Sequence, residues 1–311
     1  MDKPFRIGIT GSTGFVGKNL VSTLINKFTL RVFSRKNIHN EHPNLEFSRF
    51  SLDKSINNLN FKGIDTLIHL AGDSSFKKGT PLEGYKQRNI ESTRWLIQRA
   101  LDCGVNRVIY LSTIKVHGET STSPLSSMSN ISPEDYYSKC KFSSEQIIQE
   151  ICNEKKLDYA IIRPPIIYGP GMTGNLMSLI KIINLGIPLP FKNIKNNRSF
   201  LFIKNLEEAI LEIIKHQGKI SRIFTLADPH PISTPELISS ISRSLNIKEK
   251  NFSVSVKNLK NLSVLLGVAD KISKFTDSLE ISNEEYNNFF RTEAEIDTKI
   301  GIDFTVKSTL R

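Results

Sequence analysis

A glycine-rich turn directly follows the first strand-like stretch of the chain. RIGIT (6–10) has the pattern of a buried strand, and the next residues, TGSTGFVGKNL (10–20), carry glycines at positions 11, 14 and 17. A glycine inside a helix costs about 1 kcal/mol relative to alanine, so three at the start of one need a reason. Close approach is such a reason, because a strand, a glycine turn and a helix N-terminus present backbone N–H groups to a phosphate.

Each glycine of this turn has its own predicted role. Gly11 permits the tight turn, Gly14 lets a pyrophosphate approach the backbone, and Gly17 lets the helix pack on the strand. The spacing differs from the more common G-x-G-x-x-G, so a surface turn that binds nothing is the alternative interpretation. The choice between the two depends on the rest of the chain.

Strand-like and helix-like segments alternate through the first two-thirds of the sequence. This alternation predicts an α/β fold with a doubly wound parallel sheet of the Rossmann type. We expect residues 1–170 to form a dinucleotide-binding domain, to whose sheet residues 221–228 return, and residues 171–311 to form mainly a smaller substrate-binding lobe. The expected strands are 6–10, 30–34, 64–72, 107–113 and 159–169, and the expected helices are 15–27, 82–103 and 134–155.

The composition excludes several classes of partner. The 311 residues carry a net charge of +11, but the lysines and arginines are scattered, so we expect small phosphate ligands and no nucleic acid. No apolar run approaches the roughly 18 residues of a membrane helix, and the first ten residues lack the apolar core of a signal peptide. With three cysteines and no metal-ligand spacing, the sequence predicts a cytoplasmic protein with no membrane insertion and no metal site.

A second group of chemistry-bearing residues follows the strand predicted at 107–113. Ser112 and Thr113 stand at its carboxyl end, where open parallel sheets bind ligands. In the next predicted helix, Tyr137 and Lys141 share one face, with roughly 5–6 Å between their Cβ atoms. The phenol, with a pKa of about 10, is a poor base at neutral pH, but an adjacent ammonium and a cationic nicotinamide ring favour the phenolate. Tyr137 would then exchange a hydroxyl proton while hydride moves at the same carbon, and Thr113 would hold the reacting oxygen.

These motifs together resemble the extended short-chain dehydrogenase/reductases of the NAD(P)-dependent nucleotide-sugar epimerase/dehydratase family, nearly from end to end. Within that family, KVHGE, GMTGNLMSLI and LPF…NNRSF are most similar to the bacterial branch acting on UDP-N-acetylhexosamine derivatives for surface polysaccharides. The stretches that carry the resemblance are GSTGFVG (11–17), HLAG (69–72), NIEST (89–93), LSTIKVHGE (111–119), Y-x-x-x-K (137 and 141), RPPIIYGPG (163–171) and NRSFLFIKNL (197–206).

The resemblance implies the residues of the site. Thr113, Tyr137 and Lys141 form the expected catalytic set. The dinucleotide, NADP or NAD, is expected to contact Gly11, Thr13, Gly14, Phe15, Val16, Gly17, Ser34, Arg35, Leu70, Ala71, Gly72, Asn89, Tyr137, Lys141 and Pro164. The UDP-sugar substrate is expected to contact Lys115, His117, Asn175 and Arg198, with Asn175 capping the helix that begins at LMSLI.

Two positions depart from the pattern that is common in the family. His117 stands where many relatives have tyrosine, and it is either a substrate contact or a loop imidazole bonded to its neighbours. At the end of LRVFSRK (30–36), where NAD-selective members carry an acid, the chain has Ser34, Arg35 and Lys36, with no carboxylate before Glu41. An arginine can pair with a 2′-phosphate, so this sequence favours NADP(H), unless Arg35 is merely a surface cation.

Two reactions at C4 of a UDP-sugar share this apparatus. A 4-epimerase oxidises C4 and reduces it from the other face, whereas a 4-keto reductase performs only the second half, and Arg35 favours the reductase. A dehydratase is disfavoured because Ile114 and Lys115, not an acid, follow Thr113; a reductase of a hydrophobic ketone is a weaker alternative. A non-catalytic dinucleotide-binding sensor or scaffold would not need Thr113, Tyr137 and Lys141.

The family also implies a homodimer. The predicted helices at 82–103 and 134–155 would pair across a two-fold axis into a four-helix bundle. Their apolar residues exceed what one internal face requires, which leaves surface for a partner. The residues in question are Gly84, Ile90, Trp95, Phe142 and Ile148.

Overall fold

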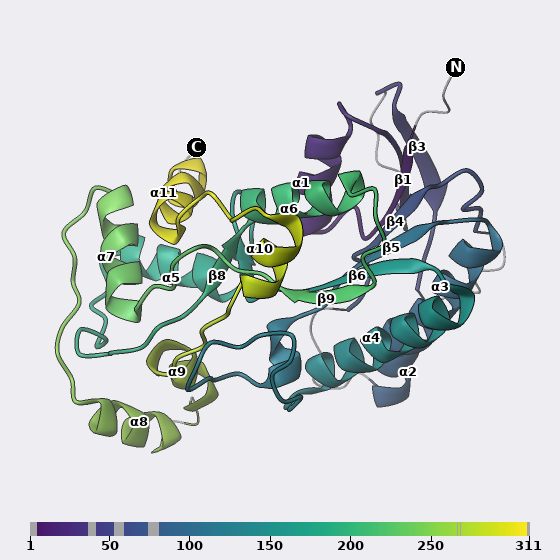
Figure 1. Cartoon of the computed structure of the whole chain (residues 1–311). Coiled ribbons are helices and arrows are strands. Elements are labelled where there is room, and N and C mark those ends of the chain that lie inside the picture. The colour runs from purple at the N-terminus through teal and green to yellow at the C-terminus, as the bar shows by residue number, and fades with distance from the viewer. Residues whose placement is uncertain are drawn as a thin grey trace. The chain divides into compact units, whose positions relative to one another are not determined.

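The protein divides into two compact units (Figure 1). The computed structural model describes residues 5–36, 42–52, 59–73, 81–265, 267 and 269–309. The first unit comprises Met1–His117, Asn130–Arg163 and Glu207–Phe224, and the second comprises Gly118–Ser129, Pro164–Leu206 and Thr225–Arg311. The chain therefore passes from one unit to the other several times.

A seven-stranded sheet forms the centre of the first unit. Its strand order is β3-β2-β1-β4-β5-β6-β9, and the pairs from β3 to β6 are parallel. The crossover between β3 and β4 moves the chain to the other side of β1, as in a doubly wound fold, so the predicted fold class is confirmed. The strands are β1 (Arg6–Thr10), β2 (Thr29–Ser34), β3 (Leu45–Arg49), β4 (Thr66–His69), β5 (Arg107–Leu111), β6 (Asp158–Arg163) and β9 (Arg222–Thr225).

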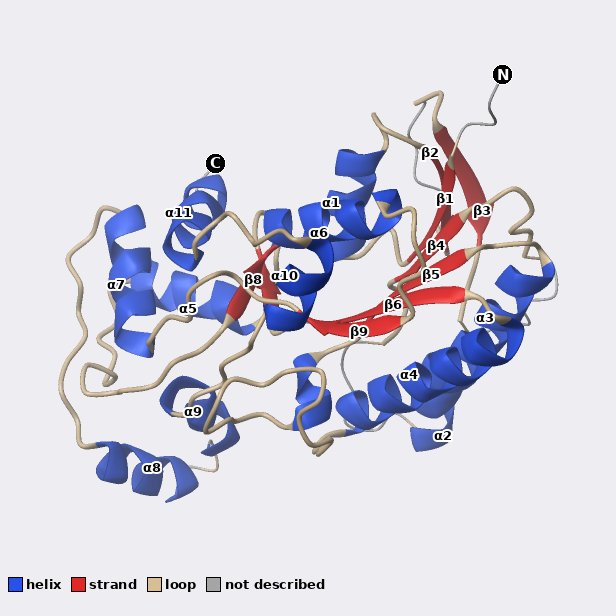
Figure 2. Ribbon diagram, in the orientation of Figure 1, coloured by secondary structure: helices blue, strands red, loops and turns tan. Residues whose placement is uncertain are grey.

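Helices cover both faces of this sheet. Figure 2 shows α1 (Phe15–Leu24) and α6 (Ile203–Lys215) on one face, and α3 (Ser92–Asp102) and α4 (Tyr136–Lys155) on the other. The segment predicted as one helix at 82–103 consists of α2 (Leu82–Lys86), a π-helical turn at Gln87–Glu91 and α3. The core between the sheet and α3 and α4 includes Leu67, Leu96, Val108, Ile148 and Ile161.

The second unit is mainly helical. Its two-stranded parallel sheet pairs β7 (Ile166–Tyr168) with β8 (Phe200–Phe202). The buried Asp228 carboxylate joins several of its segments, because it accepts hydrogen bonds from Tyr168 Oη, Phe202 N and Asn205 Nδ2, each at 2.7 Å. Its helices are α5 (Asn175–Asn184), α7 (Thr234–Ser244), α8 (Val256–Leu265), α9 (Ala269–Thr276), α10 (Glu284–Phe290) and α11 (Thr298–Thr309).

Two details of the sheets differ from the sequence prediction. The segment 159–169 is not one strand: β6 ends at Arg163, and β7 belongs to the other unit. Pro164 and Pro165 lie between them, and proline cannot donate to a central ladder. The edge strand β3 was not expected, because its residues, LEFSR, contain no continuous apolar run and are half exposed.

No helix in the part of the chain that the structure describes has the length and apolar character needed to cross a membrane.

Candidate active site

The glycine turn connects β1 to α1 as a tight backbone cradle. Gly11 has φ +73°, and a Cβ there would lie 2.8 Å from the Ala71 amide nitrogen. A Cβ on Gly17 would lie 2.6 Å from Ser12 Cα, so the start of α1 packs directly on the turn. Gly14 is the N-cap of α1 without a side-chain cap, which leaves the first helical N–H groups for another acceptor.

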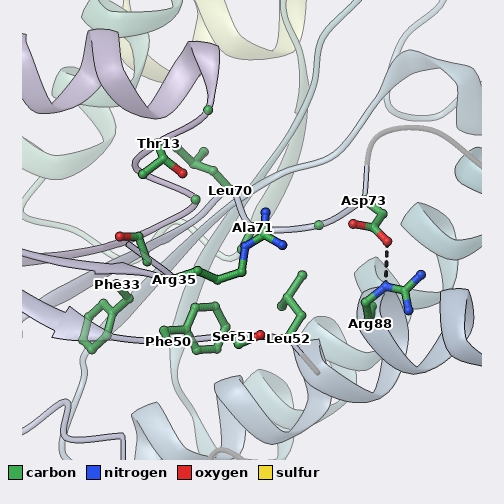
Figure 3. A pocket seen from close by; sticks show the side chains of 14 residues that line it. Thr13, Phe33, Arg35, Phe50, Ser51, Leu52, Leu70, Ala71, Asp73 and Arg88 are labelled. Atoms are coloured by element: carbon green, nitrogen blue, oxygen red, sulfur yellow. Dashed lines mark hydrogen bonds and ion pairs between the residues drawn. The ribbon is translucent and has the colours of Figure 1, made fainter. Parts of the chain in front are cut away.

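A pocket of about 240 Å³ lies against this turn, wholly within the first unit (Figure 3). Arg35 extends into it from the end of β2, toward the Leu70–Ala71 segment. Asp73 is the acidic residue among the described residues that line it, and its carboxylate pairs with Arg88 Nε at 2.7 Å. The lining residues are Gly11, Thr13, Gly14, Phe33, Ser34, Arg35, Phe50, Ser51, Leu52, Leu70, Ala71, Gly72, Asp73 and Arg88.

The pocket brings together part of the cofactor-contact set predicted from the sequence. The predicted residues among its lining are Gly11, Thr13, Gly14, Ser34, Arg35, Leu70, Ala71 and Gly72. Phe15, Val16, Gly17, Asn89, Tyr137, Lys141 and Pro164 are not part of this lining. The segment 50–52 was missed because it follows β3, a strand that the sequence did not reveal. Glu41 lies outside the described residues.

A buried hydrogen-bonded chain supports the pocket from behind. His69 is fully buried between Thr10 Oγ1 (2.8 Å) and Thr93 Oγ1 (3.1 Å). Thr93 Oγ1 donates to the Asn89 carbonyl, so it accepts from His69 Nε2–H, and Nδ1 accepts from Thr10. Burial lowers the pKa of His69 to about 3, which keeps the ring neutral. Asn89 does not line the pocket, but its Oδ1 accepts from the Asp73 amide at 2.9 Å and fixes that loop.

Lys141 and Tyr137 are placed by the first turns of α4. Asp135 caps this helix by accepting from Ser138 N at 2.7 Å. Lys141 is buried; its ammonium donates to the Leu111 carbonyl at the end of β5 (2.7 Å) and lies 4.5 Å from the centre of the Tyr110 ring. The two elements that the sequence predicted to supply the chemistry, the end of β5 and the start of α4, therefore do meet.

The electrostatics of the chain alone do not favour the Tyr137 phenolate. Burial raises the pKa of Tyr137 to about 12, and the nearby Asp135 carboxylate adds to this. Burial also lowers the pKa of Lys141 to about 8, so this side chain loses its proton more readily than a surface lysine does. A phenolate at this position needs further positive charge, such as that of an oxidised nicotinamide ring. Thr113, two residues after the end of β5, is also buried, and its Oγ1 accepts a hydrogen bond from Lys115 N at 3.3 Å.

A buried ionic network lies beneath these residues. The Glu145 carboxylate, fully buried on α4, is paired with the Arg163 guanidinium at the end of β6. Ser112 Oγ also donates to Glu145, which joins the end of β5 to the same network. Sequence reasoning missed Glu145 and Arg163. The spacing of Glu145, one helical turn after Lys141, was the available signal.

His117 belongs to this network. Arg163 Nη1 donates to His117 Nε2 at 2.8 Å, so His117 Nδ1 carries the proton and donates to the Asn130 carbonyl at 3.0 Å. Both ring nitrogens are thus engaged by the chain itself. This geometry matches the loop-imidazole interpretation and leaves neither nitrogen for a sugar. Lys115 is likewise engaged, because its ammonium pairs with Asp135 at 3.0 Å.

A second pocket lies wholly within the second unit and contains the other two predicted substrate contacts. Arg198, only 8% exposed, donates from Nη1 to the Asp277 carbonyl at 2.9 Å. Asn175 is the first residue of α5, and Gly174, with φ +96°, is the N-cap, so the prediction that Asn175 caps this helix is wrong. The lining residues are Ile166, Asn175, Leu176, Leu179, Arg198, Phe200, Ile232, Thr234, Leu237, Lys274 and Phe275.

No metal centre is visible in the described part of the chain, where no three His, Cys, Asp or Glu side chains gather as ligands. Among the described residues, the cationic groups that line the two pockets are Arg35, Arg88, Arg198 and Lys274, and such groups suit anionic ligands.

Comparison with known proteins finds relatives that match most of the chain. The chain is 33% identical to a UDP-glucose 4-epimerase of Vibrio cholerae over 286 residues, which cover 89% of this chain and 87% of that protein. It is 25% identical to an N-acetyl-alpha-D-glucosaminyl-diphospho-ditrans,octacis-undecaprenol 4-epimerase of Escherichia coli O157:H7, over 77% of this chain and 72% of the relative.

Solved structures share the fold. MoeE5 in complex with UDP-glucose and NAD has a TM-score of 0.78 at 20% identity, covering 98% of this chain and 99% of the other. A UDP-N-acetylglucosamine 4-epimerase from Methanobrevibacter ruminantium M1, in complex with UDP-N-acetylmuramic acid, has a TM-score of 0.78 at 21% identity, covering 99% of each chain. The model of the NAD dependent epimerase/dehydratase family matches residues 7–227. The chain belongs to the NAD dependent epimerase/dehydratase family.

Proposed function

We propose that the protein is a nucleotide-sugar 4-epimerase that acts at C4 of a UDP-hexose or UDP-N-acetylhexosamine. The observation that carries the proposal is the contact between the end of β5 and the start of α4. There, the Lys141 ammonium donates to the carbonyl of Leu111, the residue that directly precedes Ser112 and Thr113. The names of the Vibrio cholerae and Escherichia coli relatives support the reaction type. A sensor or scaffold would not require this buried lysine.

The first pocket fits a dinucleotide. The glycine turn leaves no room for a Cβ at Gly11 or Gly17, and Gly14 opens onto the pocket, as a pyrophosphate requires. The first N–H groups of α1 would receive the pyrophosphate, and the end of β2 would receive the adenosine ribose. When bound, the nicotinamide accepts and returns the hydride at C4.

Tyr137, Lys141 and Thr113 would handle the proton at the C4 oxygen. Tyr137 Oη would take this proton as the sugar is oxidised and return it as the sugar is reduced. The Lys141 ammonium would offset the charge of the phenolate, which burial otherwise opposes. Thr113 would hydrogen-bond the reacting oxygen. In the second unit, Asn175 and Arg198 would bind the uridine diphosphate.

A 4-keto reductase using NADPH is the second candidate, and one observation favours it. Arg35 enters the first pocket at the end of β2, where an acid would select NAD, and the Asp73 carboxylate in the same pocket is already paired with Arg88. Arg35→Asp should then weaken NADPH binding by about 100-fold while leaving NADH binding within about threefold. Equal effects on both dinucleotides would remove the support for NADPH.

The test of the epimerase is product analysis. The protein is incubated with NAD and either UDP-glucose or UDP-N-acetylglucosamine, and the products are followed by proton NMR. We expect the C4 epimer to accumulate without net formation of NADH, and Tyr137→Phe should slow its formation by about 100-fold or more. Consumption of NADPH with a UDP-4-keto sugar, and no epimer from either hexose, would instead identify the reductase.

We also propose a homodimer, as the family implies, through α3 and α4. Ile148 cannot contribute to that interface, since it is fully buried in the core of the first unit. Trp95 is 41% exposed on α3 and is the better probe. Trp95→Glu should shift light scattering from dimer to monomer, and a wild-type monomer at micromolar concentration would refute the assembly.

A further inference from the structure

We propose that Tyr110 is a positioning residue for Lys141, because the face of its ring holds the buried ammonium at the end of β5. This inference rests on the proposed function, since it takes the Lys141 ammonium as a group that the reaction uses. Tyr110 was not among the site residues that the sequence predicted. As the fourth residue of β5, it has the pattern of a core residue in a buried strand.

The first observation is how the ammonium is held. Lys141 Nζ donates to the Leu111 carbonyl at 2.7 Å, which uses one of the three N–H donors of an ammonium. The centre of the Tyr110 ring lies 4.5 Å from the same nitrogen. The face of an aromatic ring carries negative charge density, and it attracts a cation most strongly where water is excluded. Both side chains are buried, so the ring replaces part of the hydration that Lys141 loses on folding.

The other titratable groups of α4 compensate the ammonium only in part. Glu145 raises the pKa of Lys141, but burial outweighs it and brings this pKa down to about 8. The Glu145 carboxylate is also shared with the Arg163 guanidinium. Tyr137, one turn before Lys141, offers no negative charge at neutral pH, since burial raises its pKa to about 12. A further attractive contact, such as the ring face, therefore favours the charged form of Lys141.

The ring itself is fixed by its neighbours. On the β4 side, the centre of the neutral His69 ring lies 5.4 Å from the centre of the Tyr110 ring. On the α4 side, Ser144 Oγ donates to the Asn89 carbonyl at 2.9 Å. The same hydroxyl is hydrogen-bonded to the Tyr110 phenol, from which it therefore accepts. Contacts on two sides thus hold the ring in one orientation beside Lys141.

The experiment measures the acidity of Lys141 by NMR. Protein carrying isotope-labelled lysine is titrated without substrate or cofactor, and the Lys141 signal is assigned by its absence from Lys141→Met. Tyr110→Leu should raise the acid dissociation constant of this ammonium about tenfold, because a contact that favours the charged form is lost. Tyr110→Phe keeps the ring face and should stay within about threefold of the wild type.

Two controls separate the ring face from general packing. Tyr159→Leu removes another buried tyrosine of the same core, from β6, and should leave the acid dissociation constant of Lys141 unchanged. Replacing Tyr110 with a fluorinated phenylalanine keeps the shape of the ring but withdraws electrons from its face. It should raise the constant about fivefold above that of Tyr110→Phe, and it tests the contact even where Tyr110→Leu fails to fold.

The pH profile of turnover supplies the link to the reaction. Because Lys141 acts as an ammonium in the proposed mechanism, kcat should be lost as the pH rises through its pKa. In Tyr110→Leu this loss should occur at a lower pH, whereas Tyr110→Phe should keep the wild-type profile. An alkaline loss at the wild-type pH in Tyr110→Leu would overturn the positioning role.

The outcomes separate this inference from the proposed function. If the wild type forms no C4 epimer and reduces no UDP-4-keto sugar, the proposed function fails, while the NMR titration still decides on the ring contact. A constant in Tyr110→Leu within about twofold of the wild type would refute that contact. An equal rise in Tyr159→Leu would also refute it, since any loss of core packing would then have this effect. An equal rise in Tyr110→Phe would assign the effect to the hydroxyl and overturn the role of the ring face.

Discussion

Substituting Gly14 with valine separates cofactor binding from folding. The backbone of Gly14, with φ −74° and ψ 171°, is accessible to every residue, and the nearest atom to a Cβ there is Gly11 O at 3.3 Å. The cost to folding should therefore be small and partly offset by the about 0.4–1 kcal/mol gained when glycine is removed from the unfolded chain. The valine side chain would, however, occupy the pocket where the phosphates are expected.

The expected loss of cofactor affinity follows from the contacts. Hydrogen bonds from backbone N–H groups to a charged phosphate contribute about 1.5–3 kcal/mol each, so displacing two of them costs at least about 3 kcal/mol. That corresponds to a loss of more than about 100-fold in affinity for NAD. Calorimetry would measure the affinity and a thermal melt the stability.

Gly17→Val is the matched control. A Cβ there would meet Ser12 Cα at 2.6 Å, so the backbone of the turn must shift and the melting temperature should fall. NAD binding by Gly14→Val within threefold of the wild type would refute the placement of the pyrophosphate. A collapse in stability equal to that of Gly17→Val would show that Gly14 is required for packing instead.

Further predictions follow from the buried groups. Tyr137→Phe should reduce kcat by about 100-fold or more while the affinity for NAD is kept, because only the proton-transfer group is lost; single-turnover kinetics with calorimetry would check it, and parallel loss of stability and activity would contradict it. Glu145→Gln should destabilise the fold by about 3–5 kcal/mol in urea unfolding, since the buried Arg163 charge loses the carboxylate that balances it; a change below about 1 kcal/mol would contradict this. Because the pKa of His69 is about 3 in the folded state and 6.5 unfolded, the unfolded chain binds the extra proton between these values. Stability should therefore fall as the pH drops from about 6.5 toward 3, by up to about 1.4 kcal/mol per pH unit, and His69→Gln should flatten this slope; an unchanged slope would show that other groups control it.

The fold could be predicted largely from the alternation of strand-like and helix-like segments and from the glycines and prolines that separate them. The strands β1, β2, β4 and β5 are rich in apolar residues and mostly buried, a pattern that a sheet covered on both faces accommodates. What failed has local causes. β3 is half exposed at the sheet edge, so its alternating polar residues gave no apolar run, and the pocket residues that follow it were missed with it.

The site could be predicted where backbone geometry alone defines it. Gly11 and Gly17 have no room for a side chain, so their role is readable in the spacing. The roles of His117 and Lys115 depend on partners distant in sequence, Arg163 and Asp135, which no local pattern reveals. The direction of the Tyr137 pKa was missed because the sequence does not show how deeply the phenol is buried, and burial raises this pKa.

The central claim is that this chain interconverts the two configurations at C4 of a UDP-sugar. The most direct measurement is deuterium tracing by NMR, with UDP-glucose and UDP-N-acetylglucosamine deuterated at C4, enzyme and catalytic NAD. We predict that the C4 epimer forms and retains the deuterium at C4, because the same hydride is removed and returned. No epimer from either sugar, or an epimer that has exchanged its deuterium with solvent, would contradict the account.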